Sequence, residues 1–168
     1  MQTKKLILTF YISLSINSYT ATSTAYMQYV ENYVVGLKSG VKMDMKAMSI
    51  FEAAAVNEQV EEMQSLVKYG LKLEQHNFDW VFRCAGFNNK LVSMKWLISQ
   101  SLFPSQATAN ITFISAIYDD GSILEWMLSL PLGKGRPDQR AINEAYEKAR
   151  ITERRGSELL LKPYIRIK

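Results

Sequence analysis

The sequence predicts an all-α fold, a short solenoid of about three to four degenerate helical hairpins behind an N-terminal capping helix. A pattern of aromatic, small and aliphatic residues recurs at a nearly constant period through the middle of the chain. Each copy holds short stretches with apolar residues at helical spacing, and helices this short are stable only when they stack. The 168 residues, 48% hydrophobic and 21% charged, suffice for one domain with a buried core.

The N-terminal segment, residues 1–25, has the layout of a secretory signal peptide. Two lysines precede an apolar run from Leu6 to Ile16, and a polar stretch then ends in small residues at Ala25. The run is shorter than the roughly 20 residues that a membrane span needs, so we predict cleavage after Ala25 and export. The alternative is a buried first helix or strand, which the β-branched and aromatic residues of the run also allow.

Residues 26–47 are predicted to form the N-terminal capping helix. Apolar residues recur there at the spacing of one helix face, at Met27, Val30, Tyr33, Val34 and Leu37. A stack of repeats needs such an end piece, because its first repeat would otherwise expose an apolar side.

The repeats are predicted over residues 48–161, in copies at 48–78, 79–109, 110–142 and 143–161. Phenylalanines recur at equal intervals, at Phe51, Phe82 and Phe113. Three positions after each stands an alanine, at Ala54, Ala85 and Ala116. Twelve positions further stands a leucine, at Leu66, Leu97 and Leu128. A fourth copy follows after a slightly longer interval, with Tyr146, Ala149 and Leu161. An aromatic and a small residue on one helix face let the neighbouring repeat approach closely.

Each of the first three copies is predicted to carry a second helix that packs back on the first. The apolar spacing places these helices at residues 60–69, 91–100 and 123–130. Gly70 stands where a left-handed residue ends the first of them, and Pro131 stops the third. The basic tail, residues 162–168, is too short for another repeat.

Copy one resembles an ankyrin repeat, whose consensus runs roughly T-P-L-H-x-A-A-x-x-G-H-x-x-V-V-x-x-L-L-x-x-G-A. Ser49 stands at the threonine, Phe51 at the leucine, Ala54 and Ala55 at the alanine pair, and Gly70 at the late glycine. Residues 89–98 of copy two are similar to the second half of the consensus. No copy keeps the T-P-L-H tetrapeptide, which caps the first helix of an ankyrin repeat, so we expect irregular repeats. A generic α-helical bundle and another helical-hairpin solenoid remain the alternatives.

The resemblance implies a protein-binding surface made by the loops between repeats and the outer side of each first helix. The implied loop residues are Lys72, Glu74, Gln75, His76 and Arg136. The implied first-helix residues are Trp80, Arg83, Phe87, Tyr118 and Asp119. Trp80, Arg83 and Phe87 have the chemistry of binding hot spots, although packing between repeats is an equal explanation for the two aromatic residues.

The residues that carry chemistry are sparse, so we expect neither an enzyme nor a metal or cofactor. The chain has one histidine, His76, and one cysteine, Cys84. Cys84 falls on the core side of a predicted helix, away from the loop that holds His76, so no Cys-His device is expected. A lone cysteine also excludes an intramolecular disulfide and a multi-cysteine metal site.

The positive charge lies at the C-terminus. Residues 134–168 hold ten Lys or Arg against five Asp or Glu. A solvated basic helix face explains this excess more simply than nucleic-acid binding does. We therefore expect a non-catalytic protein-binding module that is exported and acts on a partner outside the cytoplasm. The alternative is an intracellular scaffold, or a small subunit of a larger assembly, that docks through the basic C-terminus.

Overall fold

The computed structural model describes residues 27–40, 42, 44 and 46–165, and the predicted signal peptide lies outside this part of the chain. The described residues form helices and no strand, which confirms the all-α class. A helix at residues 27–38 comes first. The others are α2 (Ala47–Val56), α3 (Val60–Lys68), α4 (Gln75–Phe87), α5 (Leu91–Ser99), α6 (Gln106–Ser115), η1 (Ala116–Tyr118), α7 (Ser122–Ser129), α8 (Gln139–Ile151), α9 (Arg155–Leu161) and η2 (Lys162–Tyr164).

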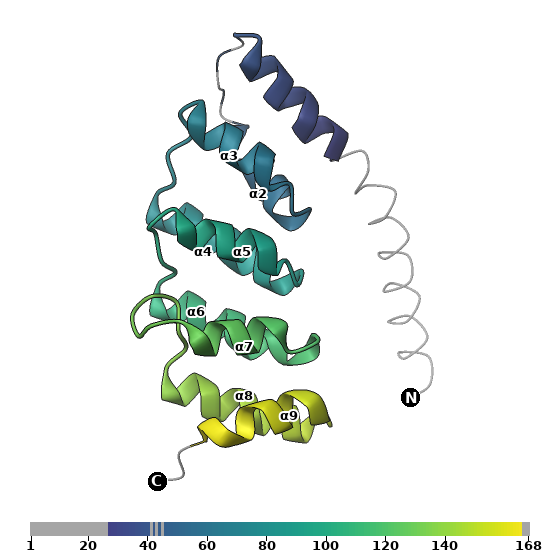
Figure 1. Ribbon diagram of the computed structural model, residues 1–168, viewed down its shortest axis with the longest axis vertical. Helices are drawn as coiled ribbons and strands as arrows, with labels where there is room; N and C mark the ends of the chain where they lie inside the picture. The colour runs from purple at the N-terminus through teal and green to yellow at the C-terminus, as the bar shows by residue number, and fades with distance from the viewer. Residues whose placement is uncertain (1–26, 41, 43, 45, 166–168) are drawn as a thin grey trace, which may run out of the picture.

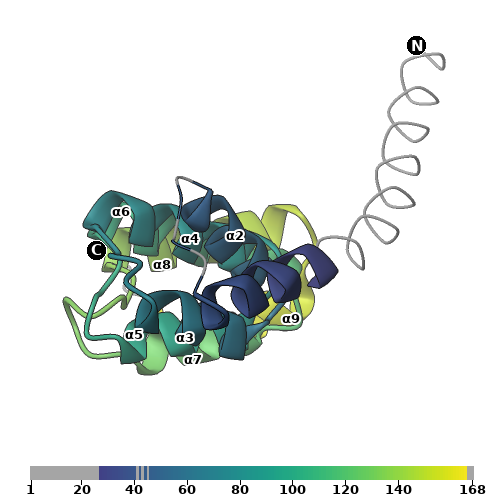
Figure 2. The ribbon, with the colours of Figure 1, turned by 90° about the horizontal axis from the view of Figure 1, so that it is seen from above.

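The helices form antiparallel pairs that are stacked in chain order (Figure 1). The pairs are α2 with α3, α4 with α5, α6 with α7, and α8 with α9. Within the stack, α2 packs on α4, α4 on α6, and α6 on α8. Seen from above, the first helices of the pairs lie in one layer and the second helices in another (Figure 2).

One core runs through the described part of the stack, and the periodic residues build it. Phe51, Phe82 and Phe113 are fully buried, as are the alanines that follow them. At the N-terminal end, Val30, Val34 and Leu37 of the 27–38 helix join the same core. The Tyr33 hydroxyl donates to Asp44 Oδ1 (2.8 Å), which ties this helix to the segment before α2.

The predicted second helices are confirmed to within one residue at their starts, because apolar spacing defines them well. Gln75 and His76, which the resemblance assigns to a loop, form part of the first turn of α4. The copy boundaries at residues 79, 110 and 143 fall inside α4, α6 and α8, which begin at Gln75, Gln106 and Gln139. The first turns of these helices are polar, so apolar periodicity does not mark them.

A hydrogen-bonded cluster, here called the junction bracket, holds the polar start of each of these helices. Gln75 Nε2 donates to Asp79 Oδ1 (3.0 Å) and to the carbonyl oxygen of Phe103 (2.9 Å). Asp79 Oδ1 also accepts the backbone N–H of Ser105 (2.8 Å). Because Ser105 is the N-cap of α6, the start of α4 fixes the start of the next first helix.

The junction bracket recurs in the next two repeats. Gln106 Nε2 donates to Asn110 Oδ1 (2.9 Å) and to the carbonyl oxygen of Arg136 (3.2 Å). Asn110 Oδ1 accepts the backbone N–H of Asp138 (3.1 Å), the N-cap of α8. Gln139 Nε2 donates to Asn143 Oδ1 (2.9 Å) and to the carbonyl oxygen of Tyr164 (2.8 Å).

The first helices α2, α4 and α8 also end alike, with one residue in the left-handed region. After α2, α4 and α8 this residue is Glu58 (φ 57°), Asn89 (φ 56°) and Glu153 (φ 56°). The next N–H donates back to the carbonyl of Ala54, Ala85 or Ala149 at 2.8–2.9 Å. This is the hydrogen-bond pattern of the Schellman motif. Gly70 (φ 110°) ends α3 in the same way, as predicted.

Tryptophans of the second helices join neighbouring repeats. The ring centroid of Trp96 lies 6.0 Å from that of Phe51, and Trp126 lies 6.3 Å from Phe82. Trp126 stands one position earlier in its repeat than Trp96 does. Leu128 is buried in the core as predicted, and the fully buried Met127 follows Trp126 as Leu97 follows Trp96.

Candidate protein-binding surface

Large apolar side chains are exposed on the outer side of the first helices. On α4, Trp80 is 48% and Phe87 is 53% exposed. Ile111 of α6 is 47% exposed and Tyr118 of η1 is 45% exposed, while Ile151 of α8 is 75% exposed. We call these residues, together with Arg83, the first-helix face.

The repeat period arranges this surface in rows that cross the layer. Phe87, Tyr118 and Ile151 occupy the same position of three successive repeats, each five positions after the periodic aromatic residue of its own repeat. Trp80 and Ile111 share a second position. Because α4, α6 and α8 lie side by side, equivalent positions stand about 8–10 Å apart, the usual distance between packed helices.

Cations lie against the aromatic rings of the first-helix face. The Arg83 guanidinium carbon is 4.8 Å from the centroid of the Trp80 ring. Lys148 Nζ and the Arg154 guanidinium carbon are 5.5 and 5.1 Å from the centroid of the Tyr118 ring. This combination of exposed aromatic area and nearby cations is typical of protein-binding hot spots.

The predicted binding residues of α4 extend along the helix. Lys72 and Glu74 precede it, and Gln75 and His76 begin it, where the His76 ring nitrogen is 3.5 Å from a Glu74 carboxylate oxygen. Trp80 and Arg83 lie in the middle of the helix and Phe87 ends it. Together with Tyr118, these three residues belong to the first-helix face. Since α4 has 13 residues, its ends are roughly 20 Å apart.

Three predicted residues have structural surroundings that the sequence did not reveal. The side chain of Gln75 belongs to a junction bracket. The Arg136 carbonyl oxygen accepts a hydrogen bond from Gln106 in the next bracket. Asp119 is partly buried, and this burial, with the neighbouring Asp120, raises the pKa of its carboxyl.

The sequence analysis missed four residues of this region: Ile111, Ile151, Lys148 and Arg154. Ile111 and Ile151 could have been found by adding the repeat period to Trp80 and Tyr118. The two cations come from the last repeat, and no sequence signal places them beside Tyr118.

The thiol of Cys84 is not a strong nucleophile. It lies half-buried between α4 and α2, with Sγ 3.5 Å from Glu52 Oε1. Burial, and secondarily the Glu52 carboxylate, raises the pKa of this thiol to about 11. Within the described ranges, no group of three or more His, Cys, Asp or Glu side chains could hold a metal ion.

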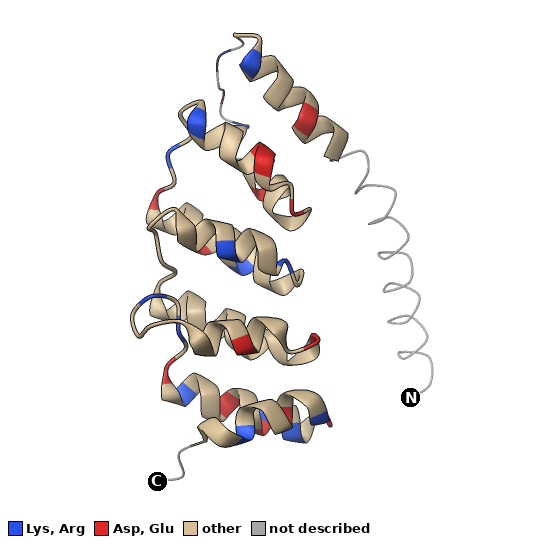
Figure 3. Cartoon of the chain, in the orientation of Figure 1, with Lys and Arg blue, Asp and Glu red and all other residues tan. Residues whose placement is uncertain are grey.

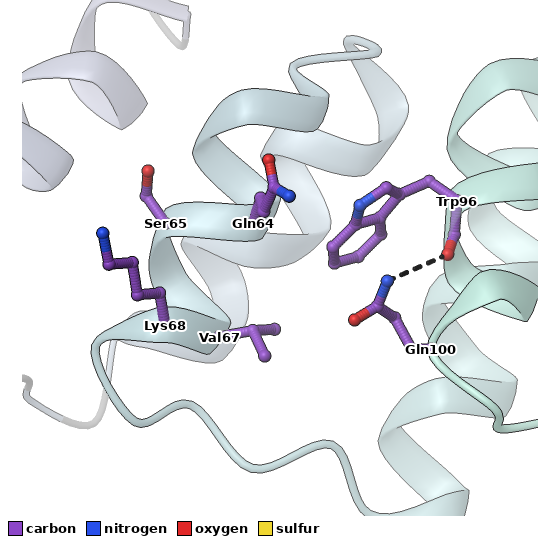
Figure 4. Close-up of a pocket in the computed structure, with 6 residues that line it drawn as sticks. All are labelled: Gln64, Ser65, Val67, Lys68, Trp96 and Gln100. Carbon is purple, nitrogen blue, oxygen red and sulfur yellow. Dashed lines mark hydrogen bonds between the residues drawn. The ribbon is translucent and has the colours of Figure 1, made fainter.

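A shallow pocket of about 520 Å³ lies on the opposite layer, between α3 and α5 (Figure 4). Its lining residues are Gln64, Ser65, Val67, Lys68, Trp96 and Gln100. The lining offers no carboxylate, imidazole or thiol for acid–base or covalent chemistry. The pocket is therefore a depression beside the Trp96 ring and a poor candidate for catalysis.

Charges of both signs alternate over α8 and α9 (Figure 3). One ion pair is close there, between an Arg150 guanidinium nitrogen and a Glu147 carboxylate oxygen (2.7 Å). The described portion of the basic C-terminal segment thus presents no uniform positive surface. Among all the residues that the structure describes, no helix has the length and apolar character needed to cross a membrane.

Comparison with protein-family models, with curated proteins and with solved structures found no match to this chain. The assignment of the repeats to a family therefore stays a proposal.

Proposed function

We propose that the chain is a divergent ankyrin-like stack that catalyses no reaction and binds another protein through the first-helix face. The observation that carries this proposal is the row of exposed apolar side chains at Phe87, Tyr118 and Ile151. Such residues repeat on a surface that no other part of the described chain covers, and clustered exposed apolar area marks interaction sites.

The helix ends support the ankyrin-like assignment. In copy one, the consensus glycine that follows the alanine pair falls on Glu58, and in copy two it falls on Asn89. Both residues have a positive φ, a conformation that favours glycine. The tetrapeptide that caps the first helix of an ankyrin repeat is absent, and the junction brackets take over the fixing of these helix starts.

Cross-linking from defined positions tests the binding proposal. A photo-reactive amino acid replaces Ile111 on the first-helix face or, as the control, Val92 on α5. The two side chains are similarly exposed, 47% and 56%, but lie in opposite layers. We expect a covalent adduct with a partner in the native source from position 111 and little from position 92. Equal labelling at both positions, or none at position 111, would contradict the proposal.

We further propose that the protein is exported, with residues 1–25 as its signal peptide. The support is the order of basic, apolar and small residues in that segment. The competing proposal is an intracellular scaffold, in which the apolar run from Leu6 to Ile16 is retained.

A further inference from the structure

Two cations of the last repeat converge on one exposed ring. Lys148 projects from α8 and Arg154 is the N-cap of α9. Both lie within 5.5 Å of the centroid of the Tyr118 ring, which belongs to the preceding repeat. The two positive charges therefore share one small surface at the end of the row formed by Phe87, Tyr118 and Ile151.

Among the described residues, neither of these two cations forms an ion pair within 4.0 Å. The ion pairs within 4.0 Å in this part of the chain join His76 to Glu74 and Arg150 to Glu147. The carboxyl of Asp119, next to Tyr118, has its pKa raised by burial and by Asp120 rather than lowered by a cation. An exposed aromatic ring stabilises each cation only weakly, so both cations remain available to an added anion.

The surroundings of the two cations favour a peptide over a nucleic acid. A phosphate backbone needs a line of positive charges along its path. Here Glu144 and Glu147 on the exposed side of α8 interrupt any such line of positive charges. Apolar side chains at Phe87, Tyr118 and Ile151 instead match a ligand that carries a carboxylate among apolar residues.

We propose that the partner presents an acidic peptide segment to the first-helix face. A carboxylate of that segment lies between Lys148 and Arg154, and its apolar side chains cover Phe87, Tyr118 and Ile151. This inference rests on the proposed function, because it names the chemistry of the partner that the face binds.

Selection from a random peptide library on the full-length protein tests the inference. Enriched peptides are expected to combine Asp or Glu with aromatic or aliphatic residues. Their dissociation constants are then measured by fluorescence polarisation for the wild type and for Lys148→Glu/Arg154→Glu. The matched control is Arg140→Glu/Lys162→Glu, which makes the same change in charge at exposed cations that have no ring contact. Unfolding midpoints of both variants show that each is folded.

We expect the Lys148→Glu/Arg154→Glu variant to weaken binding at least tenfold and the control less than twofold, with affinity falling as salt rises. The inference is overturned if the enriched peptides are neutral or basic, if both variants bind alike, if no peptide depends on the two cations, or if single-stranded DNA competes better than the peptides. The proposed function fails separately, through the loss of cross-linking at position 111.

Discussion

The surroundings of Cys84 determine the protonation state of its thiol. Its pKa of about 11 follows from burial against α2 and from the Glu52 carboxylate. At neutral pH the side chain is therefore a protonated thiol, and only the thiolate reacts. These surroundings protect the thiol from modification in the folded protein.

We predict that 5,5′-dithiobis(2-nitrobenzoate) modifies Cys84 at pH 8 at least tenfold more slowly in the folded protein than in urea. Glu52→Gln should speed the reaction of the folded protein, because it removes a negative charge beside the sulfur. Glu61→Gln, which changes an exposed side chain on α3, should leave the rate unchanged. Equal rates in the folded and unfolded protein would exclude this account.

Asp138 links two repeats and titrates below its usual range. The N–H of Ala141 donates to Asp138 Oδ1 (2.8 Å), and Asn110 Nδ2 donates to Asp138 Oδ2 (2.8 Å). These bonds, first that from Ala141, lower the pKa of the carboxyl. The ionised carboxyl thus contributes its full stabilisation at pH values above its ordinary pKa of 3.8. This stabilisation is lost as the pH falls through the lower pKa of the folded state.

We predict that Asp138→Ala lowers the free energy of unfolding at pH 7 by about 1 kcal/mol, the usual effect of losing an N-cap. The difference from the wild type should shrink as the pH falls below 3.8, where the carboxyl of the unfolded chain takes up a proton, and then through the lower pKa of the folded state. Urea unfolding at pH 7 and pH 3 measures both effects, with Glu144→Ala as the control. A difference that stays constant over this range would rule out the ionised cap.

At the scale of the element, Gly86 sets how closely α4 approaches α6. A Cβ atom at this position would overlap the Cγ2 methyl group of Thr112. The sequence analysis expected the repeated alanines to permit the close approach of neighbouring repeats. Ala85 is fully buried, and Gly86, the next residue, adds a second position without room for a larger side chain.

We predict that Gly86→Ala destabilises the protein by about 2 kcal/mol, as overpacking in a core usually does. Thr112→Ser removes the opposing methyl group, so the double variant should recover much of the loss. Thermal unfolding of the two single variants and the double variant measures this coupling. Additive effects would show that the two side chains do not meet.

The left-handed residues after the first helices carry a conformational cost. Glu153 has a φ of 56°, which a side chain makes unfavourable by about 1–2 kcal/mol. We predict that Glu153→Gly raises stability by about 0.5–1 kcal/mol, since glycine adopts this conformation without a steric penalty but loses more chain entropy. Asn89→Gly should gain less, because asparagine tolerates the same region better. A lower urea midpoint for Glu153→Gly would refute this.

The sequence predicts elements well where apolar residues define them. The second helices have this property, with Met63 and Leu66 or Met94 and Leu97 at helical spacing and fully buried. The first turns of α4, α6 and α8 hold polar residues that act in junction brackets. These turns were missed because the hydrogen bonds join residues 26–30 positions apart, and a local pattern cannot report such bonds.

At the scale of the whole molecule, burial separates aromatic residues that pack between repeats from aromatic residues that are exposed on the first-helix face. The sequence left Trp80 and Phe87 open between partner binding and packing between repeats. Both are about half exposed, while Trp96 and Trp126 pack between repeats. The family resemblance pointed to Trp80, Arg83, Phe87 and Tyr118 of the first-helix face but not to Ile111 or Ile151. The cations beside Tyr118 depend on how the last pair folds back, which periodicity does not specify.

The fate of residues 1–25 distinguishes an exported protein from an intracellular one. We predict that intact-mass spectrometry of the protein from its native source finds a chain lacking residues 1–25. That mass would direct the search for the acidic partner to proteins outside the cytoplasm. A full-length mass would contradict the signal peptide and favour the intracellular scaffold.

The junction brackets have a consequence for how the gene can change in length. The segment from Gln75 to Ser105 begins and ends at points equivalent to those of its neighbour, which begins at Gln106. Duplicating this unit would place Ser105 directly before a second copy of Gln75, with the acceptor Asp79 four positions later, as in the existing junction. The number of repeats can therefore increase with the hydrogen bonds of the new junction already supplied, and the row of exposed apolar side chains lengthens with it.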